Sequence, residues 1–344
     1  MHDLDPHSVP VIPGYGDVAN MTITSTMKVT GEVNKVRSNV EGSLAAAYTT
    51  HPDVLLFDIP SRDSNPNPNP QRSLSPLLTL TGHFKEGFGL DWARTNHDQS
   101  IVASSGNDGL ILVWDVGDPL NSIVPPFLSF GGWHDSAIGD VAFQPRASSI
   151  LAAVDDNSML AFWDLRAPNL EGPKESCKVN NGGRNLELNC VQWCEFRDPM
   201  LLVAGKNGVV ELMDTRNLSE GKPLHSLEFH DAEILSLCCS PCDESIVVTG
   251  DVNGMVCYWD LSYAKSEKAK EGVPSDLLFV HGGHNEGVSD ISMHSDVPNL
   301  TLSCAGHDVQ AWTPSNKVVS MINPNDLPLT ISSGLDYTKR GYHT

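Results

Sequence analysis

Short runs of apolar and β-branched residues alternate with polar turns along most of the chain. Two clear runs are Ser100–Ser104 and Glu244–Thr249, which are rich in isoleucine and valine. Glycine, asparagine and aspartate follow such runs, as at residues 106–109 and 251–254. Because β-branched residues favour strands and Gly, Asn and Asp favour turns, this alternation predicts an all-β fold.

One sequence pattern recurs at the end of each such unit. Three endings are nearly identical and carry Trp followed by Asp: Leu112–Asp115, Ala161–Asp164 and Cys257–Asp260. Three further endings keep the position with a changed residue: Leu56–Asp58, Leu212–Asp214 and Gln310–Trp312. The spacing is about 50 residues, slightly more than the 40–45 of a WD repeat. Six recognisable repeats predict a WD-repeat β-propeller, a ring of small sheets arranged like blades.

A histidine marker precedes most of these endings. Gly82-His83 and Gly283-His284 keep a Gly-His pair, and His134 and His230 keep the histidine alone. In a propeller blade such a histidine can bond a Ser or Thr of the second strand, and a turn carboxylate and the third-strand Trp complete a buried chain. The second repeat offers these candidates: His83, Ser104 or Ser105, Asp108 and Trp114.

The turn position of that chain varies between repeats. The position six residues before the aromatic holds an uncharged amide in three other repeats: Asn157, Asn207 and Asn253. An amide can accept a hydrogen bond but carries no charge, so we expect these blades to be less rigid than the second.

Catalysis is not indicated by these residues. A Ser, a His and an Asp in one repeat resemble a hydrolase triad, but no G-x-S-x-G elbow presents a serine. The His–Asp sets recur from repeat to repeat, which a repeated scaffold needs and an active site does not. We expect a non-enzymatic protein with no catalytic residue and no cofactor.

A metal site is not indicated either. The segment His281–His284 contains the repeat's own Gly-His marker, which explains its two histidines. Cys238, Cys239 and Cys242 are clustered, but a zinc site would need a second, well-spaced pair of ligands. Neighbouring residues of a strand point to opposite faces, so we expect reduced thiols in the core or at the surface and no bound metal.

The charge balance narrows the class of partner. Asp and Glu number 43 against 22 Lys and Arg, a net charge of -21. Such a chain repels phosphate backbones and anionic lipid, which argues against direct binding of nucleic acid or membranes. No apolar run is long enough for a transmembrane helix, and the first residues lack the features of a signal peptide. A basic protein partner is favoured, with simple solubility as the alternative explanation of the charge.

The repeats set the expected domain boundaries. We expect a flexible N-terminal segment over residues 1–19, a propeller over 20–314 and a C-terminal tail over 315–344. The stretch Met21–Val29 alternates like a strand, and we expect it to complete the outer edge of the last blade and so close the ring.

Three stretches make the family resemblance specific. Residues 81–92 (TGHFKEGFGLDW), 31–37 (GEVNKVR) and 276–284 (DLLFVHGGH) resemble motifs of the retinoblastoma-binding histone-chaperone WD-repeat family. The resemblance covers roughly residues 20–313 and keeps the order of the repeats. It implies a nuclear protein, with the cytoplasm as a second location, that binds histones three and four as a subunit of chromatin assembly and modification complexes.

The blade number differs from that family. Its members have seven blades, an N-terminal helix and a blade for which residues 1–20 offer no match. The chain is therefore expected to be a divergent or N-terminally truncated relative, and rings of six and of seven blades both remain open.

The family grips a basic histone tail with the acidic top face of the ring. The resemblance carries this role onto nine positions: Glu32, Asn34, Lys35, Glu86, Phe88, Glu187, Asn189, Glu233 and Leu235. Lys35 stands where arginine is usual, and Gly139 replaces an expected acidic residue. Carboxylates around a ring mouth can accept charge-assisted bonds from Arg and Lys. The alternative is that these are solvated loop acids.

The family's second site is a groove beside an insertion loop, which holds a histone helix. The matching positions are Pro274, Leu277, Leu278 and Phe279. The loop itself, usually acidic, is rich in lysine over Lys265–Glu271, so this site matches less well.

Two other functions remain as alternatives. A ribosome-assembly WD-repeat chaperone also shows a stretch like residues 86–92, but its Glu-rich run is absent here. A substrate receptor of a cullin-type ubiquitin ligase would carry a W-D-x-R motif, which Trp163–Arg166 matches and Met213–Arg216 nearly matches.

Overall fold

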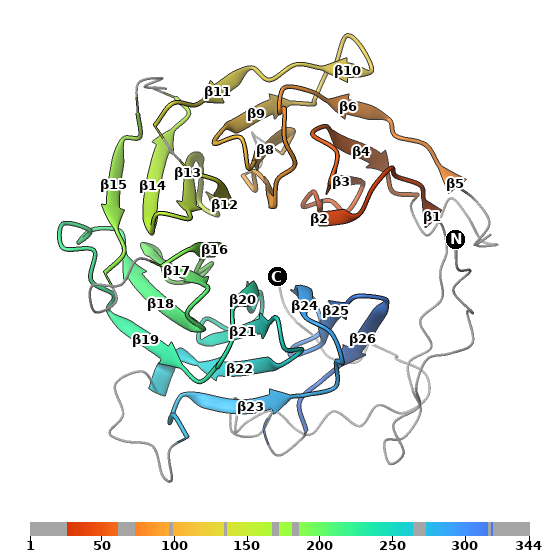
Figure 1. Ribbon diagram of the computed structural model, residues 1–344. Coiled ribbons are helices and arrows are strands. Elements are labelled where there is room, and N and C mark those ends of the chain that lie inside the picture. The colour runs from red at the N-terminus through yellow and green to blue at the C-terminus, as the bar shows by residue number, and fades with distance from the viewer. Residues whose placement is uncertain are drawn as a thin grey trace, which may run out of the picture.

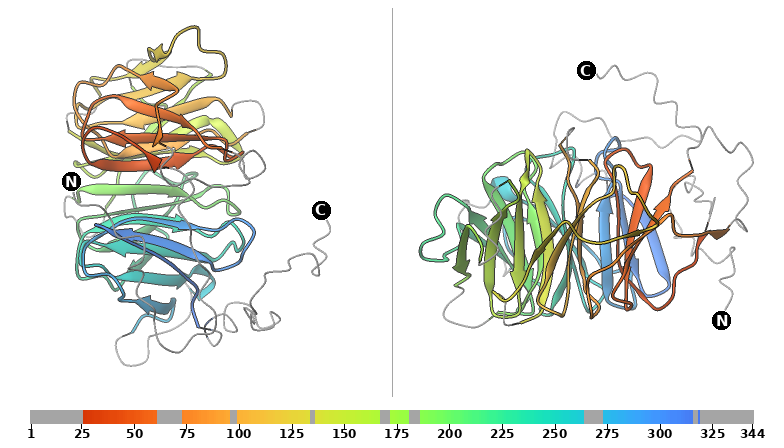
Figure 2. Two further views of the ribbon diagram at one scale, coloured as in Figure 1. Left: turned by 90° about the vertical axis from the view of Figure 1, so that its right-hand side faces the viewer. Right: turned by 90° about the horizontal axis from the view of Figure 1, so that it is seen from above.

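Six sheets stand around a common axis as the blades of a propeller (Figure 1). The computed structural model describes residues 26–60, 73–95, 99–133, 136–166, 172–180, 186–263, 273–315 and 318. Seen from the side, the strands of all the blades occupy one layer (Figure 2). The prediction of an all-β propeller with six repeats is therefore confirmed.

Each blade begins at the axis and ends at the rim. Blade one contains β2 (Val33–Ser38), β3 (Leu44–Thr49), β4 (Val54–Asp58) and β6 (Leu78–Leu80), to which β10 (Ile123–Val124) adds in parallel. Blade two contains β7 (Gly89–Trp92), β8 (Ile101–Ser105), β9 (Ile111–Asp115) and β11 (Leu128–Phe130). Blade three contains β12 (Ile138–Gln144), β13 (Ala147–Asp155), β14 (Met159–Asp164) and β15 (Glu175–Lys178).

The second half of the ring repeats this arrangement. Blade four contains β16 (Leu188–Trp193), β17 (Met200–Gly205), β18 (Val209–Asp214) and β19 (His225–Glu228). Blade five contains β20 (Ile234–Cys239), β21 (Ile246–Asp251), β22 (Val256–Asp260) and β23 (Leu277–His281), with a short 3-10 turn η2 (Leu261–Tyr263) before β23. In the described part of the chain, blade six has three strands, β24 (Val288–Met293), β25 (Thr301–Ala305) and β26 (Asp308–Trp312).

The apolar core lies between the blades. Each buried cluster combines side chains of two consecutive blades, from the first pair to the last. Between blades one and two, for example, Tyr48 and Leu56 pack in one cluster with Leu90 and Trp92. Both faces of the central strands are therefore buried, which explains why their sequences are continuously apolar rather than strictly alternating.

A charged contact joins the first and last blades. Arg37 of β2 donates to both carboxylate oxygens of Asp290 of β24, at 2.6 and 3.2 Å. The two side chains are 30% and 24% exposed. Burial alone would raise the pKa of Asp290, but the charges of Arg37 and Lys35 and the hydrogen bonds to the carboxylate together outweigh burial and hold that pKa below its usual value. In the described residues, no buried apolar cluster spans these two blades, so this ion pair closes the ring at the axis.

We expected Met21–Val29 to complete the outer edge of the last blade, and for the residues that the structure describes this prediction is wrong. Thr26 and Met27 form β1, which pairs in parallel with Ser73 and Leu74 of β5 and not with β26. Since β5 leads directly into the outer strand of blade one, this pairing holds the segment at the rim of that blade, as Figure 1 shows. Residues 21–25 of the expected strand lie outside the described residues.

Blades two, five and six contain the predicted histidine networks. In blade five, His230 bonds Asp251 and Thr249, each at 2.7 Å, and the indole of Trp259 donates to Thr249 at 2.9 Å. In blade six, His284 bonds Asp308 and Ser303, and Trp312 donates to Ser303. In both sets the histidine is buried and the bonds connect strands within a blade, which supports the structural role expected for them. His134 lies outside the described residues.

Two details of those networks differ from the sequence expectation. In blade two His83 bonds Asp108 and Ser104, but the indole of Trp114 donates to the carbonyl of Thr81 instead of closing the chain. In blade five the network uses Asp251 and not Asn253, because the turn carboxylate lies two residues further from the tryptophan than in blade two. Blade five is therefore as fully bonded as blade six.

Replacing Asp251 by alanine is expected to lower the free energy of unfolding by about 3 kcal/mol, because it leaves the Nδ1 atom of buried His230 without its carboxylate partner and frees two turn amides. Chemical denaturation measures this, with the exposed Asp231→Ala as a control that stays within about 0.5 kcal/mol of wild type. Burial lowers the pKa of His230 below 6.5 despite Asp251. The stability from neutral His230 is therefore present above pH 6.5 and falls as the pH drops below it. Equal effects of the two substitutions would contradict this role.

Candidate functional site: the acidic mouth of the ring

A backbone irregularity recurs at the start of the innermost strands. In five of the six blades the pairing of the first two strands shifts register by one residue near its beginning. The residues at the shift are Asn34, Gly139, Asn189, Leu235 and Ser289. A bulge re-aims the side chain it contains and commonly borders a functional site. Three of the residues expected from the sequence to bind a basic segment therefore occupy one structural position.

A ring of glutamates lies two residues before this position. Glu32, Glu187 and Glu233 stand directly before β2, β16 and β20. Glu86 has the same place in blade two, two residues before Phe88. We call these four glutamates, together with Asn34, Phe88, Asn189 and Leu235, the mouth ring. Eight of the nine residues expected on the top face therefore occupy just two positions of the repeat, namely the glutamate position and the position two residues after it.

One repeated hydrogen bond orients the glutamate position. In five blades its carbonyl accepts the amide of a residue in the turn between the second and third strands: Thr50, Asn107, Asp156, Lys206 and Val252. The equivalent acceptor in blade three is Ala137, which carries no charge. The turn residues therefore border the same mouth, and Asp156 supplies an acid where blade three lacks the glutamate.

The asparagines connect neighbouring blades at the mouth. Asn34 donates to the carbonyl of Gly87 in blade two, and Asn189 donates to the carbonyl of Ile234 in blade five, both at 3.1 Å. Asn189 also donates to the Glu233 carboxylate at 2.7 Å. These bonds hold the carboxylate in a defined place, which is what a site for a cationic side chain requires.

Several carboxylates lie close together over blades three to five. Burial and the nearby charges of Glu187 and Asp155 raise the pKa of Asp156 above its usual value. Lys206 lies 2.7 Å from Glu187 and supplies a cation at this point. The carboxylates outnumber the lysine, so this side of the mouth can accept further positive charge.

Exposed aromatic side chains lie on the blade-two side. Phe88 of the mouth ring is 45% exposed, and Phe84 of the same loop is 66% exposed. The amide of Phe84 donates to Asp108, which ties this loop to the histidine network. Phe84, Asp156 and Lys206 were not predicted from the sequence as site residues. Their signal is their place within the repeat, at the loop before the inner strand or at the turn after the second strand.

Lys35 lies outside the mouth ring. It follows the bulge in β2. At Asp140 and Asp290, two carboxyls of inner strands, burial acts to raise the pKa and the charge of Lys35 acts to lower it. Lys35 therefore lies near carboxylates of the inner strands, and its expected part in binding a basic segment stays a prediction.

Close packing accounts for Gly139. A Cβ at this position would overlap the carbonyl oxygen of Leu188 in blade four. The contact between blades three and four therefore leaves no room for the acidic side chain that was expected here.

The groove positions of β23 pack inward. Leu277 contacts the cluster between blades four and five, and Leu278 and Phe279 contact the cluster between blades five and six. The ring of Phe279 lies 5.9 Å from that of Trp312. The carbonyl of Pro274 accepts the amide of Leu277. These side chains stabilise the blades, and the insertion loop beside them lies outside the described residues.

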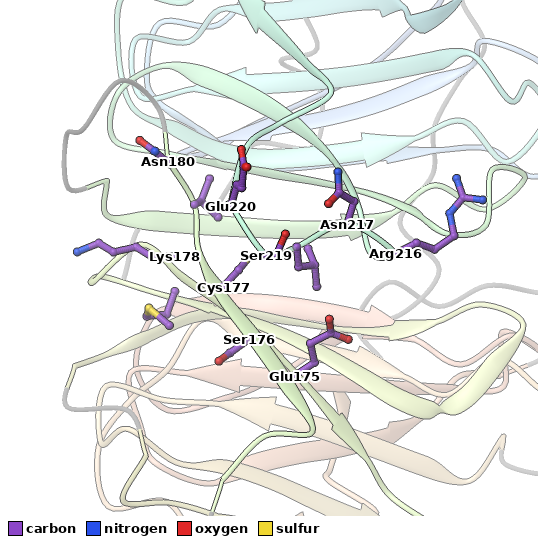
Figure 3. A pocket seen from close by; sticks show the side chains of 13 residues that line it. Glu175, Ser176, Cys177, Lys178, Asn180, Arg216, Asn217, Ser219 and Glu220 are labelled. Atoms are coloured by element: carbon purple, nitrogen blue, oxygen red, sulfur yellow. The ribbon is translucent and has the colours of Figure 1, made fainter.

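A separate cavity of about 750 Å³ lies at the rim between blades three and four (Figure 3). Strand β15 forms one wall and residues 216–221 form the other, and no mouth-ring residue lines it. Arg216 at its edge is held by Asp214 through two hydrogen bonds, and Arg166 is held by Asp164 in the same way. In both W-D-x-R-like segments the arginine is therefore hydrogen-bonded to the aspartate of the same segment.

Metal ligands do not converge in the part of the chain that the structure describes, where no three His, Cys, Asp or Glu side chains are placed to hold an ion. Among the same residues, no helix is long and apolar enough to cross a membrane. The mouth ring is therefore the strongest candidate site for a ligand that carries positive charge.

Known proteins show the same repeat. The family described as WD domain, G-beta repeat matches residues 74–115 and 221–260. The chain is 27% identical over 327 residues to the WD-40 repeat-containing protein MSI4 of Arabidopsis thaliana, a match that covers 84% of this chain and 63% of MSI4. It is 28% identical over 320 residues to MSI3 of the same plant, covering 89% of this chain and 72% of MSI3.

These comparisons confirm the resemblance drawn from the motifs. The chain is a WD-repeat protein related to MSI3 and MSI4. It spans less than two thirds of the length of MSI4.

Proposed function

We propose that the protein is a non-catalytic scaffold that binds core histones, gripping a basic segment with the mouth ring. The observation that carries this proposal is the repeated placement of Glu32, Glu86, Glu187 and Glu233 at one position of four blades. Lysine and arginine form charge-assisted hydrogen bonds with carboxylates, and these are about twice as strong as neutral ones.

The rest of the chain agrees with such a partner. The net charge of -21 attracts a strongly basic protein and repels nucleic acid. Exposed Phe84 and Phe88 beside Glu86 can pack on the aliphatic part of a lysine or arginine side chain. The family resemblance adds that the scaffold acts in the nucleus as a subunit of chromatin assembly and modification complexes.

A binding assay with recombinant core histones at rising salt tests the proposal. The protein is expected to retain histones at low salt and to lose them progressively, because the contacts are largely ionic. An equally basic but unrelated protein, such as lysozyme, serves as the control and is expected to be retained less. Failure to retain histones at low salt would overturn the proposed function.

Adding a fifth glutamate is expected to strengthen binding. Ala137→Glu places a carboxylate at the mouth-ring position of blade three, and affinity for a histone tail is expected to rise about 3- to 10-fold. Fluorescence anisotropy with a labelled tail peptide measures this. Gly139→Glu is the contrasting variant, since its side chain would meet the backbone of blade four and lower the melting temperature. An unchanged affinity for the Ala137 variant would count against blade three as part of the site.

A further inference from the structure

In blade five a cysteine occupies the position where the inner strands of blades two and four have a tryptophan. Trp92 and Trp193 end the inner strands of blades two and four, and their indoles donate to the carbonyls of Arg37 and Ala142 in the preceding blades. In each blade the next residue donates its amide to the second strand, as Ala93, Cys194 and Ser240 do. Cys239 therefore has the place of these tryptophans, and its side chain is directed toward blade four.

The residue that Cys239 meets there is another cysteine. Its thiol lies beside the thiol of Cys194, which directly follows β16. Both residues belong to the apolar cluster between blades four and five. All eight cysteines are free thiols, so this contact joins two reduced sulfurs across a blade boundary.

The neighbouring cysteines are directed elsewhere. The thiol of Cys190 faces the carbonyl of Ile234, and Cys238 packs in the cluster between blades five and six. Cys242 is exposed and contacts the carbonyls of His294 and Ser295. Cys194 is therefore the partner that the fold gives to Cys239.

We propose that Cys194 and Cys239 form a disulfide that links blades four and five when the protein is exposed to a peroxide. The thiolate of one cysteine attacks a peroxide oxygen, giving a sulfenic acid and, with hydrogen peroxide, one water. The second thiol then attacks the sulfenic sulfur, forms the S–S bond and releases a second water. Two thiols lose two electrons in total, and the peroxide is reduced to water.

Accessibility sets the order of these steps. Cys239 is half-buried while Cys194 is buried, so Cys239 meets the peroxide first and Cys194 resolves it. Donation of the Cys239 thiol proton toward Cys194, together with burial, raises the pKa of Cys239, which keeps the thiolate fraction small and the reaction slow at neutral pH. Long exposure to excess hydrogen peroxide is therefore needed.

Peptide mapping of the oxidised full chain tests the disulfide. After alkylation of free thiols and cleavage at glutamate, residues 188–195 are expected to be linked to residues 234–244. The link is expected to persist in Cys190→Ala and Cys242→Ala and to disappear in Cys194→Ala. The melting temperature of the wild-type chain is expected to rise by several degrees on oxidation, because the bond restricts the unfolded state.

Two results would overturn the proposal. One is recovery of Cys194 and Cys239 as free or singly oxidised residues after Cys242 has been oxidised. The other is a link that survives in Cys194→Ala, since the sulfur of another cysteine would then be the partner. Fragmentation of the linked wild-type peptides assigns the two sulfurs, and this decides the question even where a variant folds poorly.

Discussion

Replacing Glu187 and Glu233 together by lysine is expected to weaken the binding of a basic histone tail by roughly 100- to 1,000-fold. The two carboxylates lie on neighbouring blades, and Asn189, two residues after Glu187, donates to Glu233 and to the carbonyl of Ile234. Reversal removes two acceptors and sets two cations against the partner, beside Lys206. Fluorescence anisotropy at fixed salt measures the loss, and circular dichroism checks that the ring is folded.

A matched variant separates the site from overall charge. Glu175→Lys with Glu220→Lys changes the net charge equally, but both residues lie at the rim cavity. This control is expected to change the affinity by less than about threefold, because exposed charges further than a Debye length from the partner are largely screened. Equal losses in the two double variants would show that net charge, and not the mouth ring, attracts the partner.

Replacing Arg37 by alanine is expected to lower the free energy of unfolding by about 3 kcal/mol. The guanidinium is the link between the first and last blades, and its removal leaves the Asp290 carboxylate largely buried with the hydroxyl of Ser236 as its remaining side-chain donor. Urea denaturation measures the loss. Unfolding of the two end blades ahead of the rest would appear as a lower slope of the transition.

The pair can be tested by its coupling and by pH. Because both single variants break the same contact, the loss in Arg37→Ala with Asp290→Ala is expected to be smaller than the sum of the two single losses. The lowered pKa of Asp290 means that its contribution is present above 3.8 and disappears as the pH falls below that value. Additive losses would contradict the ring-closing role of the ion pair.

Local periodicity predicted the blades well. Each ending with Trp and Asp proved to be a third strand, because strand alternation and turn residues are properties of a few neighbouring residues. The buried His–Asp pairs followed from the same repeat. The prediction failed at the turn of blade five. Counting back six residues from Trp259 assumes that all blades share one turn geometry, and it pointed to Asn253, whereas His230 bonds Asp251.

Contacts between distant segments were not predictable in this way. The pairing of Thr26 with Ser73 depends on a long insertion whose path the pattern does not encode. The bulge at Asn34 lets that side chain bond the carbonyl of Gly87 in blade two, and a strict alternation cannot show where a register shift falls. Asp156 entered the site through its hydrogen bond to Ala137, which is likewise a contact between two loops.

The place where a histone segment binds is the central claim, and photo-crosslinking tests it most directly. A tail peptide of histone three with a photoreactive residue beside its basic cluster is bound to the full chain, irradiated and mapped by mass spectrometry. Crosslinks are expected within the loops that carry Glu86, Glu187 and Glu233 and in the turns at Asp156 and Lys206. Crosslinks confined to the rim cavity or to residues 274–279, with none at the mouth ring, would contradict the account.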